Sequence, residues 1–242
     1  APRINVSTSV ARTSFIDLRK SMNSYEYANS YNLGQAYDAY VTGNLTRRFS
    51  DKVIEKYRTQ SDPILYPDVN WTDLLVSDAS YQTQTNINIS GGTERVKYFF
   101  SAGYFTQDGL FNTDVYDPGY DYQLKYRRYN LRSNFDFNIN KNLKVSFDLS
   151  TQMDDTRGPN WSTSSFMNML VTVPSTISLG VVDNKIVMVP TTAQIPASTP
   201  MVAFIKGNHK DYANFLNGSI RVNYKMDYLT KGLAVRAAIS YK

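Results

Sequence analysis

Apolar and polar residues alternate with a period of two along much of the chain. The clearest case is residues 128–139, where apolar side chains fall on one side and charged or amide side chains on the other. Such alternation is typical of a β-strand with one face in water. It predicts strands over about residues 3–11, 83–90, 96–104, 128–139, 143–152, 220–228 and 233–242.

The connections between these strands are alternately long and short. Tight turns are predicted at residues 91–95, 140–142 and 230–232, the first with Gly91 and Gly92 at positive φ. The other connections, residues 12–80, 112–126 and 154–212, are long and irregular. In an antiparallel meander this order puts the short turns at one end and the long loops at the other, as in outer-membrane barrels.

Short helices are expected inside the long loops. Helical spacing predicts one over residues 25–37 and another over residues 163–171. Ser50 and Asn70 are suited to cap two more helices with their side-chain oxygens. Helices in these positions indicate folded loops.

Strand length decides between two all-β folds. The predicted strands reach about 9–13 residues, whereas strands of soluble proteins have a mode of about 5–6 and tilted membrane-crossing strands need about 9–11. The prediction is therefore an antiparallel meander of long hairpins, part of a transmembrane β-barrel with helix-containing extracellular loops. The alternative is a soluble, glycan-binding β-sandwich. Phe99 and Phe105 count against the barrel, because they fall on the polar face.

Composition narrows the function classes. The 242 residues include no cysteine, which excludes disulfides and thiolate metal sites. The net charge of +5 comes from scattered Lys and Arg residues, so no nucleic-acid partner is predicted. The chain enters a strand pattern almost at once, without a signal segment, and is expected to be the inside of a longer, processed protein.

Catalytic and metal chemistry find little support. The single histidine, His209, lies in a polar stretch with no second histidine nearby. Asp114, Asp117 and Asp121 do not match a calcium-loop spacing and are interpreted as turn residues. We predict no enzyme, no cofactor and no metal; a barrel enzyme would need an acid–base or nucleophile set that the sequence does not present.

Aromatic and amide residues of the loops are the candidate substrate-binding groups, because flat rings beside hydrogen-bonding groups suit sugars and peptides. They are Trp71, Tyr120, Tyr122, Asn160 and Trp161. The alternative is that they pack the loops together. A second set would face the barrel lumen and either shape an electrostatic path or pair with neighbouring charges: Arg128, Arg132, Asp136, Arg221 and Arg236.

Blocks of residues, in order along the chain, resemble one family. Residues 62–73, with Asn70 and Trp71, residues 90–109, with Gly91, Gly92 and Tyr104, and residues 126–134 are similar to the early barrel of SusC/RagA-type TonB-dependent transporters, and residues 25–28 match more weakly. The resemblance covers most of the chain.

The resemblance implies an outer-membrane barrel of about 22 strands in a Gram-negative bacterium, energised through TonB and capped by a SusD-like surface lipoprotein. Members import oligosaccharides or, in the RagA branch, peptides. Residues 1–242 would then be a partial barrel domain. The plug, the TonB-contacting segment and the remaining strands are not found in this sequence, and the outer-membrane lipid would be a further partner.

Overall fold

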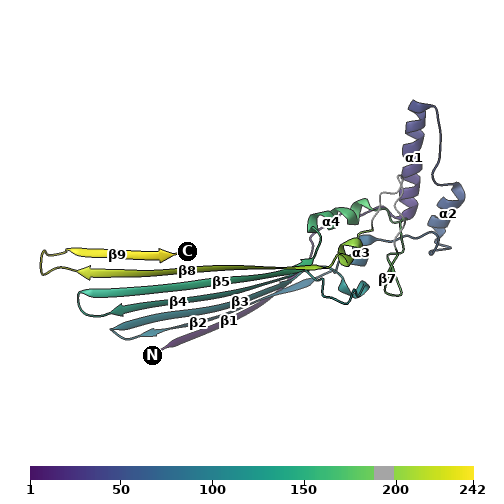
Figure 1. Cartoon of the computed structure of the whole chain (residues 1–242). Helices are drawn as coiled ribbons and strands as arrows, with labels where there is room; N and C mark the ends of the chain where they lie inside the picture. The colour runs from purple at the N-terminus through teal and green to yellow at the C-terminus, as the bar shows by residue number, and fades with distance from the viewer. Residues whose placement is uncertain (188–198) are drawn as a thin grey trace.

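The computed structural model describes residues 1–187 and 199–242 of the chain. Seven antiparallel strands form one sheet in the order β1-β2-β3-β4-β5-β8-β9, which confirms the predicted meander. Helices and long loops gather at one end of the sheet, and the short turns lie at the other (Figure 1). The strands are β1 (Arg3–Thr13), β2 (Ser80–Gly92), β3 (Val96–Asp108), β4 (Lys125–Asn138), β5 (Leu143–Pro159), β8 (Asn208–Lys225) and β9 (Ala234–Tyr241).

The register of the sheet is unbroken across its paired strands. In the β4–β5 pair it runs from Lys125 opposite Arg157 to Asn138 opposite Lys144 without an extra residue on either strand. Opposed side chains therefore share a face along the whole strand length. One row across the apolar face consists of Val6, Ile87, Ala102, Leu131, Thr151 and Leu216.

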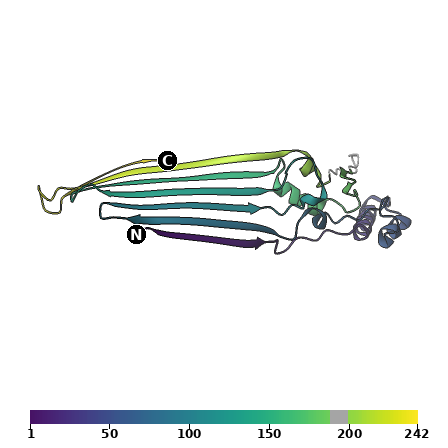
Figure 2. The same cartoon turned by 90° about the horizontal axis from the view of Figure 1, so that it is seen from below.

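The apolar face has no second sheet packed on it. Ile4 is 68%, Val6 60% and Ile239 71% exposed. In the part of the chain that the structure describes, the other sheet is a hairpin of β6 (Val181–Val182) and β7 (Lys185–Ile186) within a loop. Figure 2 shows the long strands as a single layer. The sandwich alternative needs a second packed layer and does not fit.

Two strands are longer at the loop end than the sequence pattern predicts. β5 continues to Pro159 and β8 begins at Asn208, so residues 154–159 and 208–212 are not irregular, contrary to the prediction. Alternation fails there because Asp154, Asp155 and Arg157 place charge on both faces. At the other end β8 stops at Lys225, and Tyr228, predicted on that strand, lies in the turn.

The first short turn differs from the prediction in one detail. Gly92 has φ +157°, whereas Gly91 does not adopt a positive φ. A Cβ at Gly91 would lie 2.5 Å from the hydroxyl of Tyr98, which is opposite Gly91 in the register. The absence of a Cβ at Gly91 thus leaves room for the tyrosine ring.

Helices occupy the long loops as expected. They are α1 (Ser24–Thr42), α2 (Asp51–Thr59), α3 (Trp71–Leu75), α4 (Thr163–Thr172), α5 (Val202–Ile205) and the short 3-10 helix η1 (Thr113–Val115). Ser50 Oγ accepts from the Val53 amide at 3.4 Å, and Asn70 Oδ1 from the Thr72 amide at 3.1 Å, which confirms both predicted caps. α5, η1 and the β6–β7 hairpin were not predicted. None of the described helices is long and apolar enough to cross a membrane.

The buried cores lie in the loops. The larger, here called the loop core, is built from long-range neighbours: Trp71, Leu75, Phe111, Tyr122, Phe166, Leu170, Val173, Met201, Ala203 and Phe204. The smaller joins α1 to α2 through Ala28, Phe49 and Tyr57. The loop core draws on several separate segments, and so the loops form a folded body at the ends of the strands.

Replacement of Phe166 by alanine should loosen the loop core. Phe166 is 1% exposed and its ring centroid lies 4.9 Å from that of Phe111 and 5.4 Å from that of Phe204. Loss of such a ring costs about 3–5 kcal/mol. We expect faster amide exchange in α3 and α4, measured by mass spectrometry. Ile16→Ala, at a fully exposed position, is the control; equal exchange in both variants would contradict the assignment.

Candidate functional site

The polar face of the sheet carries an ordered charge network. Asp154 Oδ1 accepts from Arg128 Nε at 3.0 Å and from the Tyr126 hydroxyl at 2.9 Å, and Oδ2 accepts from Gln152 Nε2 at 2.9 Å. The Arg128 guanidinium also lies 5.3 Å from the Tyr126 ring centroid. Arg128 is opposite Asp154 in the β4–β5 register, so the backbone pairing brings these two groups together. The network holds Arg128 in one orientation.

Two further carboxylates complete the network toward the short turns. Asp148 accepts from Asn134 Nδ2, from Arg221 and from Ser219 Oγ. Asp136 accepts from Ser146 Oγ at 2.6 Å and from Lys144 Nζ at 3.0 Å. The three carboxylates of this network are therefore each paired with a cation of a neighbouring strand.

Arg132 and Arg236, on the same face, have no carboxylate partner within the described ranges. Arg132 Nε donates to Asn134 Oδ1 at 3.0 Å, and Arg236 is exposed opposite Asn223. The Asn223 Oδ1 atom is buried with no hydrogen-bond partner among the described groups. This region has unused hydrogen-bonding capacity beside a positive charge. By register, the structure brings all the predicted lumen-facing residues, Arg128, Arg132, Asp136, Arg221 and Arg236, to one face.

Two of the predicted substrate-binding residues are buried in the loop core. Trp71 is 0% exposed and donates from Nε1 to the Pro174 carbonyl at 3.3 Å. Tyr122 is 2% exposed and donates from its hydroxyl to the Tyr116 carbonyl at 2.8 Å. Neither presents a surface to a ligand. The prediction that they bind substrate is corrected to a structural role, the packing alternative weighed for them.

Tyr120 is half-buried and joins two loops. Its hydroxyl donates to the Phe204 carbonyl at 2.5 Å and accepts from the Gly207 amide at 3.0 Å. The hydroxyl is therefore already engaged in holding the segment before β8. Asp117 and Asp121, interpreted as turn residues, accept from the Gly119 and Gln123 amides at 2.7 and 3.0 Å.

Asn160 and Trp161 keep surface available to a ligand. Asn160 is exposed, and its backbone N–H donates to the Gly207 carbonyl at 2.9 Å. This bond holds the backbone and leaves the side-chain amide available to a ligand. Trp161 is half-buried, with Lys206 Nζ 4.8 Å from its ring centroid. Its indole N–H is buried without a hydrogen-bond partner among the described residues. An aromatic ring, an amide and a cation thus lie together near the loop-end termini of β5 and β8.

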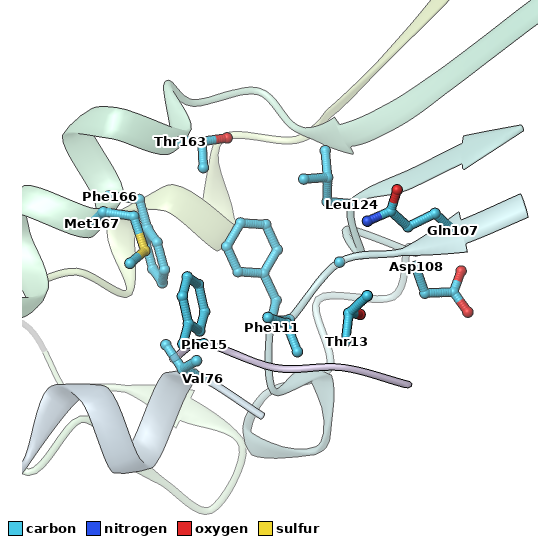
Figure 3. Close-up of a pocket in the computed structure, with 12 residues that line it drawn as sticks. Thr13, Phe15, Val76, Gln107, Asp108, Phe111, Leu124, Thr163, Phe166 and Met167 are labelled. Atoms are coloured by element: carbon cyan, nitrogen blue, oxygen red, sulfur yellow. The ribbon is translucent and has the colours of Figure 1, made fainter. Parts of the chain in front are cut away.

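A cavity of about 200 Å³ lies between the strand ends and the loop core (Figure 3). Its lining is mostly apolar, from Phe15, Val76, Phe111, Phe166 and Met167, with Thr13 and Gln107 at the strand ends. The sequence did not predict it because the lining comes from well-separated segments with no shared motif. Phe15, one of its lining residues, is 42% exposed.

The described residues include no group of three or more His, Cys, Asp or Glu side chains placed to hold a metal ion. His209 Nδ1 lies 3.0 Å from the Pro159 carbonyl oxygen, and its Nε2 lies 3.6 Å from Asp211. This histidine therefore lies where β8 begins, beside the end of β5.

Comparison with known proteins adds a family context. No family model matches the chain. TonB-dependent receptor P26 of Formosa agariphila is 25% identical over 164 residues, which cover 68% of this chain and 15% of that protein. The RagAB peptide importer superposes on 98% of this chain with TM-score 0.64, at 19% identity in its closed-closed state and 18% in its open-open state. This chain has the fold of a SusC/RagA-type barrel segment.

The SusC/RagA-type resemblance drawn from the sequence blocks is thereby confirmed, as is the assignment to part of a β-barrel. The chain spans 27% of the RagAB chain that it matches. Most of that importer chain therefore has no counterpart in this sequence.

Tyr122 should give the loop core a pH-dependent stability. Burial, followed by the nearby carboxylates of Asp114 and Asp117, raises the pKa of Tyr122 to about 12, against about 10 in an unfolded chain. The stability from the neutral phenol is full below pH about 10 and is lost as the pH rises through about 12. In a pH titration we expect a step in tyrosinate absorbance at a pH of about 12 that the Tyr122→Phe variant lacks. Tyr40→Phe, at a 93% exposed position, is the control; an early step lost in Tyr122→Phe would contradict the assignment.

Proposed function

We propose that residues 1–242 form part of the barrel wall of a TonB-dependent importer in the outer membrane of a Gram-negative bacterium, which takes up oligosaccharides or peptides. One observation carries the proposal: a seven-stranded sheet with an uncovered apolar face that matches the RagAB peptide importer over 98% of the chain. The relative from Formosa agariphila is a TonB-dependent receptor, and this supports uptake that is energised through TonB.

The height of the apolar face fits a bilayer. On the β4 side it extends from Tyr129 to Ile139. Ten residues of strand rise about 33 Å, and a tilt of about 40° reduces this to about 25 Å along the membrane normal. This is the height of the apolar band of an outer-membrane barrel, about 25 Å. In this proposal the apolar face contacts lipid and the charge network faces the lumen.

The partial sheet implies further segments of the same polypeptide. Within the described residues, β1 and β9 each pair on one side only. Unpaired backbone groups are not tolerated in lipid, so the remaining barrel strands would close the sheet. The plug domain and the TonB-contacting segment would belong to those other parts. A SusD-like lipoprotein would sit over the loop body, which forms the extracellular end.

Substrate would first meet Asn160, Trp161 and the cavity between the strand ends and the loop core. It would then pass Arg132 and Arg236, which have no carboxylate partner among the described residues. The task of these residues is binding and passage. The relatives named above are a receptor and an importer, and this supports a protein that is not an enzyme.

Uptake assays test the proposal directly. Deletion of the gene that encodes this chain should abolish uptake of one labelled class, an oligosaccharide or a peptide, and deletion of tonB should have the same effect. Copurification with a tagged surface lipoprotein tests the partner. Undiminished uptake of both classes in the deletion strain would overturn the importer assignment.

The Asn160→Ala/Trp161→Ala double variant should raise the KM for uptake. Loss of a stacking ring removes about 1 kcal/mol, which corresponds to about a fivefold change in KM. Tyr40→Ala, also an exposed loop aromatic, serves as the matched control and should leave KM unchanged. Equal KM values for the double variant and the wild type would remove these two residues from the substrate site.

A further inference from the structure

On the apolar face of the sheet, which faces outward in the proposed barrel, charged residues replace apolar ones at the strand ends nearest the loops. Tyr129 lies opposite Met153, and two residues nearer the loops Arg127 lies opposite Asp155. The next position along places Lys125 opposite Arg157, and Arg157 opposite Lys210. Because the register has no bulge, these side chains share the face of Leu131 and the other lipid-facing residues.

Five cations follow the extracellular border of the apolar band, and we call them the basic belt: Arg12, Lys125, Arg127, Arg157 and Lys210. Adjacent strands lie about 4.8 Å apart, so Lys125 and Lys210, two strands apart, have backbones about 10 Å from each other. Arg12 lies opposite Tyr81 on β2, and so continues the belt toward the other edge of the sheet.

Only two of the belt cations are paired with carboxylates. Lys125 Nζ lies 2.8 Å from Asp121, and Arg157 contacts Asp155 at 2.9 and 3.1 Å. In the described part of the chain, Arg12, Arg127 and Lys210 have no ion pair. Asp108 lies opposite Lys125 in the register and is one of the residues that line the cavity between the strand ends and the loop core (Figure 3). Three of the five belt cations therefore carry unpaired positive charge on this face, which also bears the carboxylates of Asp108 and Asp155.

Exposed tyrosines lie among these cations. Tyr212, 70% exposed, is opposite Asp155, and Tyr81, 59% exposed, is opposite Arg12. Tyrosine rings at the border of an apolar band are suited to the headgroup level of a membrane. Their rings and hydroxyls also suit the flat faces and hydroxyl groups of sugars.

We propose that the basic belt binds the phosphorylated sugar headgroup of an outer-leaflet glycolipid. The inference rests on the proposed membrane location. The belt continues the lipid-facing surface, so its occupant must be joined to an apolar tail that covers the band below. Arg and Lys side chains bind phosphate through charge-assisted hydrogen bonds, and the interleaved tyrosines bind sugar. The occupant is thus a phosphoglycolipid that stays on the transporter as a fixed part of its lipid shell.

Retention of lipid by the full-length transporter tests the proposal. The Arg127→Gln/Lys210→Gln variant and the wild type are purified in detergent and incubated with vesicles of purified lipopolysaccharide. Bound lipid is then quantified by native mass spectrometry. We expect the variant to retain about tenfold less, since each basic residue near an anionic membrane surface contributes substantially to binding. Wild-type protein should retain dephosphorylated lipopolysaccharide equally poorly.

The matched control removes two cations at the opposite end of the sheet. Lys141→Gln/Lys231→Gln changes exposed lysines of the short turns and should retain lipid as the wild type does. Equal lipid retention by both double variants would overturn the proposal that the basic belt binds the lipid headgroup. Equal competition by phosphatidylglycerol vesicles would overturn the glycolipid assignment. Wild-type protein that stays monomeric without detergent would overturn the membrane location itself, whereas detergent dependence of all three proteins with no difference between them would overturn only the belt.

Discussion

Every other feature of the structure depends on the continuous hydrogen-bond register of the sheet. A shift of one residue reverses the face of every side chain on a strand. A slip of β5 by one position would turn Asp148 and Asp154 onto the apolar face and Leu149 and Met153 onto the polar one. Since a buried or lipid-exposed charge costs several kcal/mol, such slips are strongly disfavoured. The alternating sequence therefore specifies both the register and the separation of lipid-facing from polar residues.

The sequence could predict the sheet where the two faces meet different surroundings, and it failed where they do not. Residues 128–139 alternate cleanly, and β4 was located within a few residues. Above the apolar band both faces of β5 and β8 meet water, so Asp154, Asp155 and Lys210 give no periodic signal and the strand ends were missed. Phe105, an exception on the polar face, has its ring centroid 6.0 Å from that of Tyr126, and this contact accounts for it.

The candidate site was harder to predict because its aromatic residues look alike in sequence. Trp71 and Trp161 are the two tryptophans of the chain, each in a long loop beside asparagine. Trp71 is enclosed because Phe166, Phe204 and Leu75 converge on the same core from other segments. Such long-range convergence leaves no local pattern. Trp161, at the end of β5, lies at the edge of this core and remains half-buried.

The polar face of the sheet and the basic belt on its outward face differ in how their charges are paired. On the polar face, Asp154 and Asp148 each accept several hydrogen bonds, so the side chains of Arg128 and Arg221 are fixed and their charge is neutralised locally. In the proposed importer, such a wall would let polar solutes pass without binding them tightly, because strong binding would slow release. Arg132 and Arg236 on that face, and Arg12, Arg127 and Lys210 of the basic belt, have no carboxylate partner within the described residues. The proposed retention of an anionic headgroup by the belt therefore uses cations that no carboxylate of the described residues neutralises, on the side of the sheet where the occupant would not need to leave.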